Sequence, residues 1–134
     1  MTTNRWRICI DFGTATSKAS LCAAPGEKDQ PKDVMHPLKL GHVTGEQNSF
    51  LVQSMLLFEA GRVNFGALAL ERANDPVSRA DPLHSFKTFL ASRDLEQAIH
   101  LRLRRNVDES NAFSQYDAIV LYTAYLLVLS DRAL

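Results

Sequence analysis

Short, mostly apolar stretches bounded by polar or turn-forming residues occur at the start of the chain, which is typical of β-strands. Residues 7–11 and 17–24 are two such stretches, separated by a polar turn, and they predict a pair of strands. Turn-forming residues at 26–33 predict a loop. Residues 34–40 predict a third strand, which Pro37 either interrupts or confines to a sheet edge because proline has no backbone N–H.

The middle of the chain changes from a strand pattern to a helix pattern. A polar connection at 41–48 is followed by residues 50–65, which predict a hairpin with its turn at 59–62. Residues 67–73 are strong helix formers, and they predict a helix that ends before Pro76.

Two further segments predict short elements. Asp81 is a favourable helix N-cap and is followed by proline at the first helical position, so we expect a short helix through Leu90. At residues 98–105, apolar residues alternate with basic residues, which predicts a strand with one solvated face.

The C-terminal segment predicts the longest helix. Ser114 and Asp117 resemble a capping box, with Asp in place of the usual Glu, and open a helix that runs to the end of the chain. This helix is apolar on nearly all sides, so it needs cover on more than one side. Its apolar run, residues 118–129, is shorter than the ~20 residues of a membrane span, and we expect no membrane partner. Its tyrosines are expected in the core or at a lobe contact: Tyr116, Tyr122 and Tyr125.

Composition indicates one folded domain with balanced charge. The chain has 134 residues, of which 46% are hydrophobic, and 15 basic residues balance 15 acidic ones. We therefore expect no nucleic-acid partner. The basic residues near 102–105 lack interleaved aromatic residues and indicate a solvated strand face. The histidines have no regular metal-ligand spacing.

Cysteine usage and the N-terminus indicate a cytoplasmic protein. The two cysteines form neither a disulfide framework nor a zinc pattern, and the first residues lack the apolar segment of a signal peptide. Within its strand, Cys9 is interpreted as an inert thiol, buried or half-buried.

The turn between the first two strands carries the candidate chemistry. Asp11 ends one strand and can hold a hydrated magnesium ion through water. Gly13 tolerates a positive φ and has no side chain to keep a phosphate away. The backbone amides that follow can bind phosphate oxygens, and Lys18 can supply a positive charge. The predicted phosphate-binding residues are Gly13, Thr14, Ala15, Thr16 and Lys18. An ordinary hairpin turn that binds nothing remains the alternative.

The sequence Ile-Cys-Ile-Asp-Phe-Gly-Thr at residues 8–14 resembles the first phosphate motif of the actin, sugar-kinase and heat-shock ATPase superfamily. Residues 52–58, 61–69 and 85–90 and the final helix are similar, in the same order, to segments of the seventy-kilodalton heat-shock (DnaK-like) chaperones. The resemblance implies an α/β, ribonuclease-H-like (actin-like ATPase) partial domain with a mainly antiparallel or mixed sheet. Residues 1–134 would form part of its N-terminal lobe, with a peripheral subdomain at about 34–111. The implied ligands are ATP or ADP with Mg²⁺, on the condition that further sequence completes the cleft, and the implied partners are protein clients.

Two departures from the chaperone pattern change what the resemblance implies. Leu70 stands where the chaperones have a lysine that is important for hydrolysis, whereas Lys18 matches a phosphate-contacting lysine of actin. The second phosphate loop and the adenosine-binding segment of the family have no counterpart after Leu90. We therefore expect one wall of a nucleotide site, with no ATP hydrolysis by this chain alone and no assigned catalytic residue. The alternative is a non-catalytic binding or scaffold module that kept the fold. Either way, apolar surface left on the last helix would favour self-association.

Overall fold

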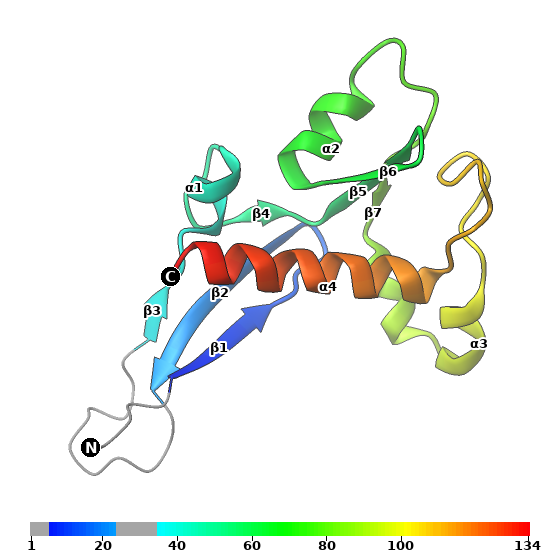
Figure 1. Ribbon diagram of the computed structural model, residues 1–134. Helices are drawn as coiled ribbons and strands as arrows, with labels where there is room; N and C mark the ends of the chain where they lie inside the picture. Colours follow the sequence, from blue (N-terminus) through cyan, green and yellow to red (C-terminus); the bar gives the residue numbers. More distant parts are fainter. Residues whose placement is uncertain (1–5, 24–34) are drawn as a thin grey trace.

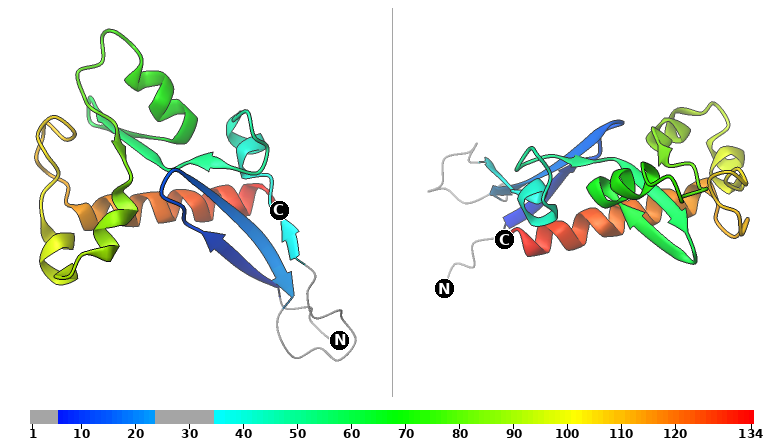
Figure 2. Two further views of the ribbon diagram at one scale, coloured as in Figure 1. Left: turned by 180° about the vertical axis from the view of Figure 1, so that it is seen from behind. Right: turned by 90° about the horizontal axis from the view of Figure 1, so that it is seen from above.

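The computed structural model describes residues 6–23 and 35–134, which form two small sheets and a long C-terminal helix (Figures 1 and 2). Every strand pair among these residues is antiparallel. The predicted α/β class, the mainly antiparallel sheet and the long final helix are thereby confirmed. The loop predicted at 26–33 lies outside the described residues.

The first sheet is built on an N-terminal hairpin. β1 (Trp6–Asp11) pairs along its whole length with β2 (Thr16–Ala23). The short strands β3 (Met35–Pro37) and β4 (Val52–Gln53) pair with separate parts of β2. β3 ends at Pro37 on the edge of the sheet, as the sequence predicted. β1 occupies the opposite edge, and most of its residues are exposed.

The β1–β2 hairpin has one apolar face and one polar face, because side chains alternate along a strand. Ala19 is buried, and Ile10 and Leu21 pack against the core. Asp11 and Lys18, which lie opposite each other in the register, are both exposed. The strand pattern of the sequence thus places the predicted charged residues on the solvent side of the sheet.

The second sheet contains the predicted hairpin of the middle segment. β5 (Met55–Glu59) pairs with β6 (Arg62–Phe65), and β7 (Leu83–His84) adds to the other side of β5. Ala60 and Gly61 form the turn with φ values of 50° and 73°, as expected for a two-residue turn that matches the strand twist. The apolar stretch predicted as one strand is divided at Ser54, which separates β4 from β5.

The structure differs from the prediction in two segments, the polar connection at 41–48 and the helix expected after Asp81. The polar connection at 41–48 contains helix α1 (Leu40–Thr44), because Leu40 is fully buried and Gly45 ends the helix with a φ of 74°. The helix expected from Asp81 is replaced by β7 and a 3₁₀ segment, η1 (Phe86–Ala91). Asp81 accepts a hydrogen bond from the Asn106 amide at 2.6 Å, so its side chain joins two loops and caps no helix.

The strand predicted at 98–105 is wrong. Helix α3 (Leu95–His100) covers its start, with the Asp94 carboxylate accepting a hydrogen bond from the Gln97 N–H at 3.2 Å. After this helix, Arg102 forms only an isolated bridge to Ser114. Tertiary burial decided the local structure: Leu103 is buried, whereas the apolar residue Leu101 of the same alternation is exposed.

The two remaining helices agree with the sequence. α2 (Gly66–Ala73) starts directly after β6 and ends before the proline, as predicted. α4 (Gln115–Arg132) begins with the predicted capping box: the Ser114 hydroxyl accepts from the Asp117 N–H, and the Asp117 carboxylate accepts from the Ser114 N–H at 2.7 Å. None of the helices in the described ranges is long and apolar enough to cross a membrane.

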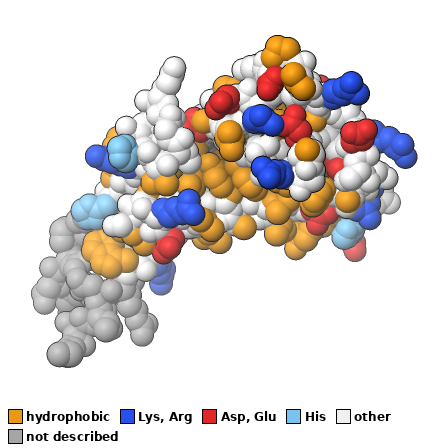
Figure 3. Space-filling model, turned by 45° about the horizontal axis from the view of Figure 1, so that its top comes forward, with side chains coloured by type: hydrophobic (Ala, Val, Ile, Leu, Met, Phe, Trp, Pro, Cys, Tyr) orange, Lys and Arg blue, Asp and Glu red, His pale blue; other side chains and the backbone are white. Residues whose placement is uncertain are grey.

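α4 packs across both sheets and organises the core (Figures 1 and 2). Its buried residues are Ala118, Tyr122, Leu126, Leu129 and Ser130. The opposite side of the helix stays exposed, including Val120, Leu127 and Val128 at 45%, 51% and 50% exposure. The expected apolar surface around the last helix is therefore present, and Figure 3 shows hydrophobic side chains gathered along the middle of one face of the molecule.

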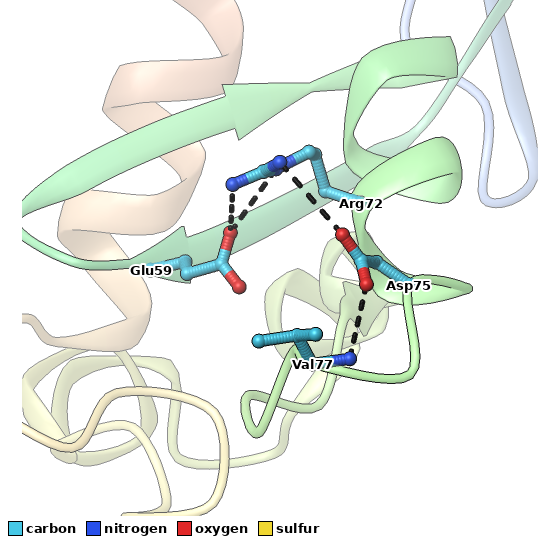
Figure 4. Close-up of polar contacts among 4 residues, drawn as sticks. All are labelled: Glu59, Arg72, Asp75 and Val77. Atoms are coloured by element: carbon cyan, nitrogen blue, oxygen red, sulfur yellow. Dashed lines mark hydrogen bonds and ion pairs between the residues drawn. The ribbon is translucent and has the colours of Figure 1, made fainter.

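Arg72 holds α2 against the second hairpin (Figure 4). Its guanidinium lies 3.2 Å from the Glu59 carboxylate on β5 and 3.9 Å from the Asp75 carboxylate. Asp75 in turn accepts a hydrogen bond from the Val77 N–H at 3.0 Å. Because these groups are partly exposed, each ion pair contributes at most about 1 kcal/mol, and their main effect is on the orientation of α2.

We predict that Ser114→Ala lowers the free energy of unfolding by about 1 kcal/mol, because it removes the N-cap acceptor of α4. Urea denaturation followed by circular dichroism measures this change. Ser49→Ala, at an exposed serine before β4, is the matched control and should change stability by less than about 0.5 kcal/mol. Equal stability of the two variants would contradict the role of the cap.

The capping box also predicts a pH dependence. Hydrogen bonds from the Ser114 N–H and hydroxyl lower the pKa of Asp117. The stabilisation by its carboxylate is thus complete above the ordinary unfolded value of about 3.9 and is lost as pH falls through the lowered folded pKa. Asp117→Asn should flatten this acid limb of the stability curve, whereas Glu71→Gln at an exposed α2 position should leave it unchanged. Identical limbs in wild type and Asp117→Asn would contradict the prediction.

Candidate functional site

The candidate phosphate-binding turn connects β1 to β2 at the end of the first hairpin. Asp11 and Lys18 flank it as opposite residues, and the Lys18 ammonium lies 3.5 Å from the Asp11 carboxylate. Both side chains are about three-fifths exposed, at 61% and 60%. The structure therefore brings together the two charged residues that the sequence predicted for this site.

The backbone carbonyls of the turn are held from the inside by Ser54. The Ser54 hydroxyl donates to the Gly13 carbonyl at 2.8 Å, and the Ser54 N–H donates to the Ala15 carbonyl at 2.9 Å. Ser54 itself is 2% exposed, and its hydroxyl lies 2.9 Å from that of Ser17. Ser54, which lies between β4 and β5, thus holds the carbonyl groups of Gly13 and Ala15 toward the core.

With these carbonyls directed inward, the turn leaves N–H groups for a ligand. The part of the chain that the structure describes provides no acceptor for the N–H groups of Gly13, Thr14 and Ala15. Thr14 and Ala15 are exposed, so these donors are accessible to an anion in solution. Thr16, the last residue of the predicted amide set before Lys18, is the first residue of β2 and lies opposite Gln53 of β4 in the register. Its exposed hydroxyl stays beside the turn.

Gly13 is required because of a close backbone contact and not because of the expected positive φ. The described glycines with positive φ are Gly45, Gly61 and Gly66, so Gly13 does not use a left-handed conformation. A Cβ atom at Gly13 would instead lie 1.9 Å from the backbone oxygen of Thr16. The tight approach of two backbone segments excludes any side chain here and keeps the turn narrow.

Phe12 anchors the turn in the core. Its ring centroid lies 5.5 Å from that of Phe86 in η1 and 5.2 Å from that of Tyr122 in α4. The Lys87 ammonium lies 6.0 Å from the centroid of the same ring. Sequence reasoning assigned no role to Lys87 or Ser54, because only the fold brings residues this distant in the chain to the turn.

Tyr122 completes the buried polar network behind the turn. Its hydroxyl donates to the Gln53 carbonyl at 2.9 Å and lies 3.5 Å from the Ser54 hydroxyl. Burial raises the pKa of Tyr122, so its hydroxyl keeps the proton that it donates. The prediction of core tyrosines holds for Tyr122 and the half-buried Tyr125, whereas Tyr116 is 52% exposed.

The site has few candidate metal ligands. Among residues 6–23 and 35–134, no three histidine, cysteine, aspartate or glutamate side chains lie close enough together to hold a metal. The exposed Asp11 carboxylate fits a hydrated Mg²⁺, which retains most of its water and needs few protein ligands. Leu70, at which the sequence predicted a missing phosphate-binding charge, is half-buried in α2.

A cavity, the basic segment and Cys9 lie outside the candidate turn. A cavity of about 760 Å³ lies between the β5–β6 hairpin and residues 105–113, and no residue of the turn lines it. In the basic segment, Arg102 donates a hydrogen bond to the Ala112 carbonyl, which gives it a structural contact. Cys9 is exposed, so its assignment as a buried or half-buried thiol is wrong: β1 is an edge strand, and Cys9 is on its outer side.

No family model matches this chain, and a search of curated proteins finds no match.

We predict that Ser54→Ala destabilises the protein by about 1–3 kcal/mol, because it leaves buried polar partners without their hydrogen bonds. Chemical denaturation measures the loss, and the N–H of residue 54, which donates to the Ala15 carbonyl, should lose protection against hydrogen exchange. Ser92→Ala, at an exposed serine after η1, is the matched control and should be nearly neutral. Unchanged protection of the residue 54 N–H in Ser54→Ala would contradict the proposed clamping of the turn.

Proposed function

We propose that this chain supplies the first phosphate-binding wall of an ATP–Mg²⁺ site, in an actin-like, ribonuclease-H-like ATPase architecture of the DnaK-like chaperone type. The observation that carries the proposal is the turn itself: accessible N–H groups at Gly13, Thr14 and Ala15 beside the Lys18 ammonium. Successive backbone N–H groups and a cation in one place form a good binding site for phosphate oxygens.

Lys18 is available for a ligand although it pairs with Asp11. An ion pair between exposed side chains contributes only about 0–1 kcal/mol, so a phosphate can displace or share this contact at little cost. Thr14 and Thr16 add exposed hydroxyl donors on the same turn. The turn therefore provides charge and directional hydrogen bonds together.

Asp11 is the proposed anchor for the metal. A bound Mg²⁺ would neutralise phosphate charge and orient the triphosphate. The carboxylate would hold the hydrated ion through water, while Lys18, directly opposite on β2, would contact the phosphate. Lys18 would supply the positive charge that Leu70 lacks, and Lys87, beside Phe12, is a second cation near the turn.

The chain alone is proposed not to hydrolyse nucleotide, because it supplies one wall of the site. Phosphoryl transfer requires charge neutralisation and positioning from several sides. The described residues present an open turn on one side of a hairpin, and neither cavity of about 760 or 390 Å³ is lined by residues of that turn. In a complete ATPase, a second wall would close the cleft, and protein clients would be the partners.

A non-catalytic scaffold is the second candidate, and the exposed side of α4 favours it. Val120, Leu127 and Val128 are apolar residues on the exposed side of this helix, without cover among the described residues. Such a surface suits a protein partner or a second copy of the chain. This function needs no nucleotide, so ligand binding distinguishes the two candidates.

We predict that Lys18→Ala abolishes Mg-ATP binding by the complete protein. Wild-type protein should show a higher unfolding temperature in millimolar Mg-ATP, since a ligand of the native state raises stability by mass action. Lys39→Ala removes one exposed lysine away from the turn and should retain the full shift. An equal shift in Lys18→Ala would contradict the role of Lys18, and no shift in wild type would favour the scaffold.

A further inference from the structure

The two cysteines of the chain lie on the outer face of the β1–β2 hairpin. Cys9 is opposite Ser20, and Cys22 is opposite Arg7, so the two cysteines are diagonal neighbours on adjacent strands. Strand alternation places Asp11 and Lys18 on this same face, whereas Ala19 and Leu21 point to the core. The face combines a thiol pair with the charged pair of the turn.

The two sulfur atoms are in contact. Cys9 Sγ lies 3.1 Å from Cys22 Sγ, and the Ser20 hydroxyl lies 3.9 Å from Cys22 Sγ. Cys9 is exposed and Cys22 is half-buried, so reagents in solution can reach the pair. The chain has 2 cysteines, which makes these thiols the only ones that an intramolecular disulfide can join.

We infer that Cys9 and Cys22 form a reversible dithiol–disulfide pair that reacts with low-molecular-weight disulfides such as oxidised glutathione. One cysteine, as a thiolate, attacks the glutathione disulfide and forms a mixed disulfide, releasing one glutathione thiolate. The second cysteine thiolate attacks the protein sulfur of this mixed disulfide and releases the other glutathione. The protein loses two protons and two electrons, and glutathione disulfide is reduced to two glutathione thiols.

Proximity favours the second step over a stable mixed disulfide. The resolving thiol is already at contact distance in the native fold, so ring closure requires little loss of conformational freedom. The hydrogen bond to Cys22 raises the pKa of the Cys9 thiol, so the exchange should accelerate as pH rises.

The exposed position makes the pair suitable for reversible oxidation. Cys9 and Cys22 are diagonal neighbours on adjacent strands, and their sulfur atoms are nevertheless within contact distance. A disulfide at this exposed place is accessible to thiols, which reduce it by exchange. Metal binding is a weaker interpretation, because the described residues supply no third ligand beside the two sulfurs.

The test is oxidation of the full chain by glutathione disulfide, followed by alkylation of free thiols and mass spectrometry under non-reducing conditions. Wild-type protein should lose both alkylatable thiols together, gain no glutathione and form no disulfide-linked dimer, and dithiothreitol should restore both thiols. Cys9→Ser and Cys22→Ser should each keep one glutathione adduct, because they lack the resolving thiol.

A Leu21→Cys/Cys22→Ser variant provides a geometric control. It keeps two cysteines but moves the second to the face of β2 that packs on the core, and it should not form the intramolecular bond. Circular dichroism is measured for every variant, so that only folded variants are compared. Persistent mixed disulfides, disulfide-linked dimers, or unreacted thiols in folded wild-type protein would each overturn the inference. These outcomes do not depend on nucleotide binding, so they test the thiol pair separately from the proposed function.

Discussion

The hydrogen bonds of Ser54 to the two carbonyls of the first turn are the contact on which the candidate site depends. They direct the acceptor groups of the turn to the core and thereby leave its donor groups to solvent. The Ser54 hydroxyl belongs to a buried network with Ser17 and Tyr122, so the turn, β4 and α4 are joined by polar contacts as well as by packing. A satisfied buried network of this kind specifies one arrangement, because each broken bond leaves an unpaired polar group.

The β1–β2 hairpin separates structural and chemical roles by its two faces. One face contributes Ile10, Ala19 and Leu21 to the core that α4 covers. The other face carries the charged pair and the thiol pair in solvent. This separation is possible within a short hairpin because successive side chains along a strand point to opposite faces of the sheet.

Local sequence signals predicted the elements whose causes are local. The capping box of α4, the turn at Ala60 and Gly61 and the pairing of β1 with β2 depend on nearby residues, and the structure contains them. The helix expected after Asp81 and the strand expected at 98–105 were wrong, because contacts with distant residues decided those segments.

The same distinction applies to the site. Asp11 and Lys18 were predictable because they flank one turn and therefore face each other across the hairpin. Ser54 lies 41 positions from Gly13, and Lys87 follows a different sheet, so no short-range pattern points to either. The exposure of Cys9 was not predicted, because the exposure of a residue on an edge strand depends on which segments lie beside that strand in the fold. Without this information, Cys9 was interpreted as a buried or half-buried thiol, and its contact with Cys22 was not considered. The ribonuclease-H-like architecture and nucleotide binding stay predictions.

Among the described residues, β1 pairs with β2 on one side only, and Trp6 and Ile8 on this strand are 42% and 40% exposed. Its outer backbone groups can therefore accept an additional strand, which would extend the sheet by ordinary ladder hydrogen bonds. Such strand addition would fix the segment leading into Asp11 from both sides. An open strand edge is a place where chains can aggregate. At the edge of β1, pairing with another polypeptide segment would instead stiffen the hairpin.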